Sequence, residues 1–347
     1  MKRAWILGVC SLMGCGNSVS ECTNATTGAE GQFVASMITA PMSSNDFAFD
    51  LNGDGHTDNR LGNIIGALIQ NGLNVQDGIN TSVTDGSVLL LVDEKASDLT
   101  NNDCASVDVK KGQKPTSPPA FNGNDMFSID SSFGTGTVKG KISGGKFTSN
   151  NPATASTDYS LSVQFPLVTG EAPLSLTIHG AHLQFTKGTS GLMNGQINGG
   201  IKSEDVQGSI IPTVAALLTN RLKNNTGGQN STIQSLFDTG GTDDGSGCML
   251  TANTCSGAQP AGTAACKNPA SYPSSVSADV QARAGKCADQ CDNIIDVCEV
   301  STNSLVKNLL APDVQLFTNG AYKPSADNKM KDSLSLGLGF TAVNAKF

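Results

Sequence analysis

The sequence has few of the residues on which most enzyme signatures depend. Only three of its 347 residues are histidine, and aromatic residues make up 5%. His179 and His182 lie three positions apart in a predicted strand, where such residues face opposite sides, so we do not expect them to share a metal ion. Neither the His-Glu-x-x-His pattern of zinc proteases nor the Gly-x-Ser-x-Gly pattern of serine hydrolases occurs. The sequence therefore predicts no catalytic residue.

Positive charge is scarce as well. Lysine and arginine total 22 against 30 acidic residues, which gives a formal net charge of −8. A nucleic-acid-binding protein needs a basic face for the phosphate backbone, so we expect no nucleic-acid partner. We expect no nucleotide either, because Phe147 replaces the serine or threonine that a phosphate-binding loop at 140–146 would need. The Gly-x-Gly pattern at 337–339 is followed by too few residues for the crossover helix of a dinucleotide site.

The N-terminal apolar stretch is too short to cross a bilayer as a helix. Lys2 and Arg3 precede it at 4–10, and Leu12-Met13-Gly14-Cys15 follows it. A charged start, a short apolar middle and small residues at the end are typical of a signal peptide. Residues 12–15 resemble the lipobox of bacterial lipoproteins, whose cysteine carries lipid and becomes the first residue of the mature chain.

This resemblance implies that residues 1–14 are a lipoprotein signal peptide and that Cys15 is the lipid attachment site. The implied partner is membrane lipid, which holds the body of an exported protein at the bacterial envelope. Gly16 differs from the aspartate that resembles an inner-membrane retention signal, so we expect anchoring in the outer membrane. An ordinary secretory signal cleaved nearby is the alternative.

The cysteines agree with export. Of ten cysteines, Cys10 would leave with the signal peptide and Cys15 would carry the lipid. The remaining even number is expected to form disulfides in an oxidising compartment; zinc binding is the less favoured alternative. Six of them cluster between 248 and 298, which indicates local bridges there and leaves Cys22 to pair with Cys104. The disulfide candidates are Cys22, Cys104, Cys248, Cys255, Cys266, Cys287, Cys291 and Cys298.

One stretch, residues 50–58, has the spacing of a metal-binding loop. Oxygen-bearing side chains stand at alternate positions with a glycine where the loop must turn, and calcium prefers such oxygen ligands. The spacing matches positions one, three, five, six, seven and nine of the EF-hand loop, so the stretch resembles EF-hand-like and dockerin-like calcium loops. The predicted ligands are Asp50, Asn52, Asp54, the backbone carbonyl of His56, and Asp58, with Gly55 at the turn.

The resemblance stops at position twelve, where Leu61 replaces the glutamate that supplies two oxygens. Another carboxylate, such as Asp46, Asp85 or Asp93, or water would have to complete the coordination. The alternative is an Asx-rich turn whose side chains only cap their own backbone. If calcium binds, we expect it to fix the start of the following helix.

Periodicity predicts an α+β fold. Apolar residues recur at helical spacing over 61–69, 75–83 and 206–222, and alternate at 138–144, 161–165, 174–178, 183–185 and 333–340. The stretch 101–124 reads as a linker because of its prolines and charges. We expect an antiparallel sheet, curled or sandwich-like, with packed amphipathic helices and a disulfide-stapled helical region.

The predicted organisation follows the chain in five parts. They are a signal peptide at 1–14, a polar tether at 15–32, calcium-loop helices plus antiparallel sheet at 33–235, a cysteine-rich and partly helical region at 236–311, and C-terminal strands returning to the sheet at 312–347.

Three functions are compatible with these features. The first is a calcium-stiffened, lipid-anchored envelope or surface protein with a non-enzymatic role in adhesion or interaction, whose partner would be a protein or an envelope component. The second is a carrier that holds a lipid or another hydrophobic ligand between sheet and helices. The third is an exported hydrolase with an acid pair such as Asp125 and Asp130, which has no spacing signal behind it.

Overall fold

The computed structural model describes residues 21–25, 27–70, 75–165, 174–224, 237, 241–243, 248–250, 295 and 297–347. Most of this part of the chain forms one antiparallel sheet, in the strand order β5-β4-β3-β2-β1-β13-β8-β7-β6. The strands are β1 (Ala29–Thr39), β2 (Leu90–Ala96), β3 (Asn102–Lys111), β4 (Gly136–Ser143), β5 (Lys146–Ser149), β6 (Leu161–Phe165), β7 (Leu174–Lys187), β8 (Gly191–Lys202) and β13 (Ser333–Asn344). Two small hairpins are β9 (Gly241–Asp243) with β10 (Cys248–Leu250), and β11 (Phe317–Thr318) with β12 (Ala321–Tyr322).

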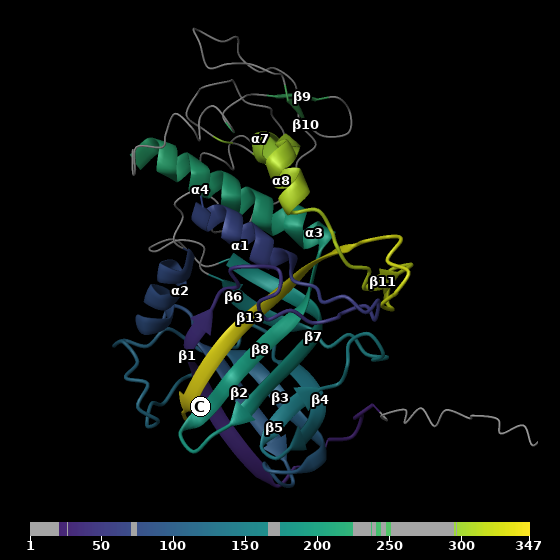
Figure 1. The fold of residues 1–347 in the computed structure, drawn as a ribbon. Helices are drawn as coiled ribbons and strands as arrows, with labels where there is room; N and C mark the ends of the chain where they lie inside the picture. Colours follow the sequence, from purple (N-terminus) through teal and green to yellow (C-terminus); the bar gives the residue numbers. More distant parts are fainter. Residues whose placement is uncertain are drawn as a thin grey trace, which may run out of the picture.

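The sheet closes on itself. The second half of β7 pairs with β5, with Phe185 opposite Phe147, whereas its first half pairs with β6. The closed ring therefore runs β1-β2-β3-β4-β5-β7-β8-β13 and back to β1, with β6 beside it (Figure 1). The Phe147 and Phe185 rings stack across the closing pair of strands, with centroids 5.2 Å apart, which stabilises that seam.

The interior of the ring is filled by side chains. Burial alternates along β4, so Val138 and Ile142 point inward while Thr137 and Lys141 face solvent. Each large side chain buried there contributes about 1.5–3 kcal/mol to folding. Among the largest fully buried side chains are Phe33, Phe147, Phe185, Ile142, Leu161, Ile178, Leu183 and Leu192.

Helices cover one end of the ring (Figure 1). Ile65 of α1 and Ile79 of α2 belong to the same buried cluster as the inward side chains of the strands. A second cluster joins α4 to α7 and α8. The helices are α1 (Arg60–Gln70), α2 (Val75–Thr84), α3 (Ser203–Asp205), α4 (Ile211–Asn224), α7 (Val297–Thr302) and α8 (Ser304–Leu309), with a π-helical turn at Val206–Ile210. No helix within the described ranges is both long and apolar enough to cross a membrane.

The α+β class predicted from the sequence is confirmed, with a local error. β3 occupies residues that the sequence analysis assigned to a linker. The error has a physical cause, because Val107 and Val109 point inward but alternate with charged Asp108 and Lys110, which form cross-strand ion pairs and so make the strand look polar. The two strands predicted at 174–178 and 183–185 are one continuous strand, β7, with an irregularity around Gly180.

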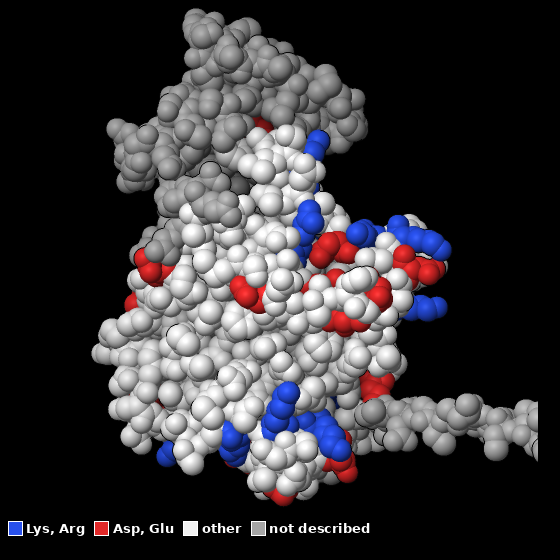
Figure 2. All heavy atoms as spheres, viewed as in Figure 1, with Lys and Arg blue, Asp and Glu red and all other residues white. Residues whose placement is uncertain are grey.

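The predicted tether at 15–32 is structured over its last part. β1 begins at Ala29, and Cys22 forms a disulfide with Cys104, as predicted. The side chains of the other six disulfide candidates lie outside the described residues. Charge is unevenly distributed over the folded part, and Figure 2 shows few charged side chains over the middle of β1 and β13.

Candidate metal centre

The predicted metal loop is a closed turn held against the outside of the sheet. The backbone of Asp58 pairs with that of Phe49, and the Asp58 carboxylate accepts a 3.0 Å hydrogen bond from the Leu51 amide. Gly53 and Gly55 have φ angles of 81° and 85°, which glycine adopts at little cost. Leu51 is fully buried against Val314 and Leu316, so the loop cannot shift without exposing apolar surface.

The loop leads directly into α1. Asn59 caps the helix, because its Oδ1 accepts hydrogen bonds from the amides of Gly62 and Gly337 at 3.2 and 3.0 Å. Its Nδ2 donates to the Gly337 carbonyl of β13. One residue therefore connects the loop, the start of the helix and a central strand.

Within the loop, each side-chain acceptor is bonded to a nearby backbone amide. Asp50 accepts from Gly53 at 2.7 Å and from Gly55 at 2.9 Å, and Asp54 accepts from His56 at 2.9 Å. Asn52 accepts from the Asp54 amide at 3.1 Å. These are the Asx contacts of the alternative interpretation, but a carboxylate oxygen has a second lone pair, so they leave acceptor capacity for a cation.

The carboxylates of the loop act on one another electrostatically. Burial, together with the negative charges of Asp313, Asp54 and Asp50, raises the pKa of Asp58 to about 7, although the hydrogen bond from the Leu51 amide acts in the opposite direction. Burial also raises the pKa of Asp313. Within the described part of the chain, no lysine or arginine forms an ion pair with Asp50, Asp54 or Asp58. The three loop carboxylates therefore have no cationic partner among the described residues, whereas Arg60 partly offsets the charge of Asp313.

The carboxylates that the sequence offered to complete the site have other partners. Asp46 accepts hydrogen bonds from the amides of Met42 and Ser43. Asp85 pairs with Lys114 at 3.0 Å, and Asp93 lies in the lysine cluster described below. The carboxylate that stands near the loop is instead Asp313. No sequence signal identifies it, because its proximity depends on β13 returning beside β1.

The donor set fits a hard cation, but it is not assembled as a ligand cluster. The candidates are carboxylate, amide and carbonyl oxygens, which suit calcium rather than zinc or copper. Across the described ranges, no three His, Cys, Asp or Glu side chains are grouped in a way that would hold a metal ion. The His56 side chain is exposed, and the prediction that its backbone carbonyl is a ligand stays a prediction.

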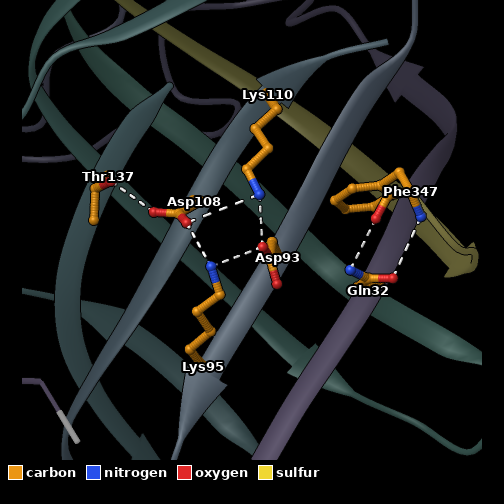
Figure 3. Close-up of polar contacts among 7 residues, drawn as sticks. All are labelled: Gln32, Asp93, Lys95, Asp108, Lys110, Thr137 and Phe347. Carbon is orange, nitrogen blue, oxygen red and sulfur yellow. Dashed lines mark hydrogen bonds and ion pairs between the residues drawn. The ribbon is translucent and has the colours of Figure 1, made fainter. Parts of the chain in front are cut away.

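A second polar site, the outer charge cluster, comprises Asp93, Lys95, Asp108 and Lys110 on the outside of β2 and β3 (Figure 3). Lys95 lies 2.9 Å from Asp93 and 2.8 Å from Asp108, and Lys110 lies 2.6 Å from Asp93. Burial raises the pKa of Asp93, but the hydrogen bonds from the two lysines outweigh burial and the net shift is downward. The charges neutralise one another, so the cluster is suited to stabilising the sheet.

Buried polar contacts also join β5 to β7. The Ser149 hydroxyl lies 2.9 Å from His182 Nδ1 and accepts a hydrogen bond from the Leu183 amide. Burial lowers the pKa of His182 to about 4, and its ring stacks on Phe49 at 3.7 Å. A neutral imidazole that is 1% exposed, next to a hydroxyl already bonded to the backbone, serves to fasten the strands rather than to activate a nucleophile. His179 bonds separately to Asp158 at 2.7 Å, so the two histidines have different hydrogen-bond partners.

A groove of about 870 Å³ lies on the outside of β4 and β5, beside the disulfide. We call it the β4–β5 groove. Its lining is mixed in charge and rich in amides and hydroxyls, and Lys141 pairs there with Asp103 at 2.8 Å. The lining includes Glu21, Cys22, Asp103, Lys141, Lys146 and Asn150.

Comparison with known proteins gives no indication of function. No family model, no curated protein and no solved structure matches the chain.

Proposed function

We propose that the protein is a lipid-anchored envelope protein that acts by interaction rather than by catalysis, stiffened by calcium at residues 50–58. The observation that carries this proposal is the closed sheet with a filled interior. Such a body offers a rigid outer surface, whereas a carrier needs an internal volume for its ligand. The lipobox resemblance at residues 12–15 supplies the anchor, and the outer membrane remains the expected location.

The carrier is less well supported than the interaction protein. A cavity near the helical end of the sheet, between Leu90, Val163 and Phe340, has a volume of about 30 Å³. That is room for roughly one water molecule, whereas pockets for organic ligands measure about 300–1,000 Å³. An exported hydrolase has equally little support, because Asp130 pairs with Lys111 and its pKa is lowered to about 2 by hydrogen bonds from Ser132 and Lys111.

Calcium would have a structural role in this proposal. Asp50, Asn52, Asp54, Asp58 and the His56 carbonyl would hold the ion, whose charge would offset that of the loop. Because the loop is continuous with the start of α1, binding would stabilise the placement of this helix on the sheet. The expected contribution follows mass action: about 2.7 kcal/mol when free calcium exceeds the dissociation constant a hundredfold.

Native mass spectrometry of the purified full chain, with and without a chelator, tests the proposal. We expect one calcium ion that the chelator removes, together with a mass increment of lipid on Cys15. Replacing Asp50 and Asp54 by asparagine should abolish calcium binding and leave the lipid in place. The control variant D327N alters an exposed aspartate paired with Lys329 and should change neither. A chain that carries neither calcium nor lipid would overturn the proposal.

A further inference from the structure

The segment that leads from the proposed anchor is fixed to one side of the body. Cys22 is bonded to Cys104 of β3, and its backbone amide and carbonyl both bond to the side chain of Asn150, just after β5. The Glu21 carboxylate accepts hydrogen bonds from the amide and hydroxyl of Ser156. These contacts hold residues 21 and 22 at the rim of the β4–β5 groove.

The length of chain between the anchor and this point is short. Glu21 stands six positions after Cys15, and a fully extended chain of that length spans about 20 Å at most. Without the contacts at Cys22, the first residue fixed to the sheet would be Ala29, fourteen residues from Cys15, with a reach of roughly 50 Å. The contacts of Glu21 and Cys22 therefore more than halve the longest distance that the chain can span between the anchor and the folded body.

The strand order of the closed sheet shows which surface lies opposite the β4–β5 groove. In the ring, the strands across from β4 and β5 are β13 and β1. Figure 1 shows β13 and the end of β1 on the side away from residues 21–25, and Figure 2 shows few charges over this part. Met37 of β1 is 47% exposed on that face, and Met193 of neighbouring β8 is 50% exposed. The groove side, by contrast, carries charges of both signs, from Lys141 and Lys146 and from Glu21 and Asp103.

We infer that the anchored protein lies with the β4–β5 groove against the lipid headgroups and turns the weakly charged β1–β13 face away from the membrane. This inference rests on the lipid anchor of the proposed function. Glu21 and Asp103 of the lining are bonded to Ser156 and Lys141, and the remaining lysine, amide and hydroxyl groups would bond to the phosphate oxygens of the headgroup layer. Lys146 forms no ion pair with any described residue, so its ammonium group is available for this contact. The β1–β13 face would then be the surface presented to a partner.

Tryptophan fluorescence provides a direct test, because the only tryptophan, Trp5, lies in the predicted signal peptide. Two single-tryptophan variants are matched: S143W at the exposed groove side and M37W on the opposite face. The acylated proteins are placed in phosphatidylcholine vesicles that contain a trace of headgroup-labelled acceptor lipid. We expect several-fold more energy transfer from S143W than from M37W. Equal transfer, or more from M37W, would overturn the inference.

Two further variants test whether the short segment between Cys15 and Cys22 causes the orientation. A flexible spacer of about 20 Gly and Ser residues inserted between Cys15 and Glu21 adds roughly 25 Å of average reach and should remove the difference. The spacer leaves the folded body unchanged, whereas the C22S/C104S variant removes the disulfide itself and should have the same effect. A difference that persists with the spacer would overturn the role of the segment.

Failure of the anchor gives a different result from failure of the orientation. Protein with the C15S substitution should not associate with vesicles. If it associates as well as the acylated protein does, the lipid anchor of the proposed function is wrong. If only the acylated protein associates, but both tryptophans transfer equally, the anchor stands and the orientation is wrong.

Discussion

Two adjacent carboxylates of β2 have opposite environments. Asp93 points out of the ring and contacts two lysines, at 2.9 and 2.6 Å. Glu94 points into the ring, is fully buried, and neither of its oxygens has a hydrogen-bond partner among the described residues. The pKa of Asp93 is lowered, whereas burial raises the pKa of Glu94 to about 7 and the charge of Lys187 offsets this only partly.

The difference lies in how a sheet tolerates a buried acid. On the outer face, long lysine side chains from neighbouring strands reach Asp93 and keep it ionised. Among the described residues, no donor inside the ring reaches Glu94. Its neutral form avoids the cost of a buried charge, and Gly31, which faces it in the ladder next to the Phe33 ring, leaves room for its side chain. The cost of burying a carboxylate is therefore reduced by ion pairs on the outer face and by protonation on the inner face.

Removing the lysines should have the largest effect. In the K95M/K110M variant, the Asp93 carboxylate, which is 2% exposed, would lose both cationic partners. Leaving a buried charge unpaired costs about 3–5 kcal/mol, so urea unfolding at neutral pH should show a loss of that size. The variant K329M breaks an exposed pair with Asp327 and should lose less than about 0.5 kcal/mol. A similar small loss in both variants would show that the outer cluster adds little.

Replacing Glu94 by glutamine should act in the opposite direction and depend on pH. The folded-state pKa is raised from 4.5 to about 7, so the stabilising contribution is present below the unfolded value and is lost as the pH rises toward 7. That difference corresponds to about 3 kcal/mol. E94Q should therefore be more stable than the natural protein by about this amount at pH 8 and similar to it at pH 4.

Unfolding at several pH values measures this effect, with E204Q as the control. Glu204 is exposed in α3, so its replacement should leave the pH profile unchanged. If E94Q and the natural protein show parallel stability profiles between pH 4 and 8, Glu94 does not titrate inside the ring.

The Ser149–His182 contact between β5 and β7 is a third kind of buried polar group, which is neutral and hydrogen-bonded. S149A would leave the Leu183 amide and His182 Nδ1 without their partner, and such losses cost about 1–3 kcal/mol. The control S132A removes a hydroxyl that bonds Asp130 at the exposed surface and should stay within about 0.5 kcal/mol. Denaturant unfolding compares the two variants. A neutral result for S149A would mean that the stacked aromatic rings alone hold the seam.

Local signals explain which parts of the fold were predictable. Alternation over 333–340 predicted the strand that became β13, and helical spacing after residue 60 predicted α1. β3 was missed because the charges at Asp108 and Lys110 hide its alternation, and they are tolerated only because β2 supplies their partners. The pairing of β5 with β7 was not predictable at all, since it depends on a three-dimensional closure that has no local cue.

The candidate site was likewise predictable only where its residues form a local pattern. The loop at 50–58 could be found from its spacing, because every residue of that pattern lies in one short segment. Asp313 could not, since it approaches Asp58 only after the last strand has returned. Glu94 was hidden in a run of charged residues that reads as surface, although β2 alternates between an ionised outer face and a neutral inner one.

The metal loop extends the comparison to Asp50 and Asp54, which are less buried than Glu94 and have no lysine partner among the described residues. Without calcium, D54N should stabilise the protein by about 0.5 kcal/mol, because it removes repulsion at Asp58 yet keeps an oxygen that accepts the His56 amide. With saturating calcium, the same substitution should destabilise the protein, because it removes charge from a ligand. Thermal unfolding of D54N and the natural protein, with chelator and with calcium, measures both signs. The reversal separates a calcium loop from an Asx-rich turn, because a turn that only caps its own backbone would respond identically in the two buffers.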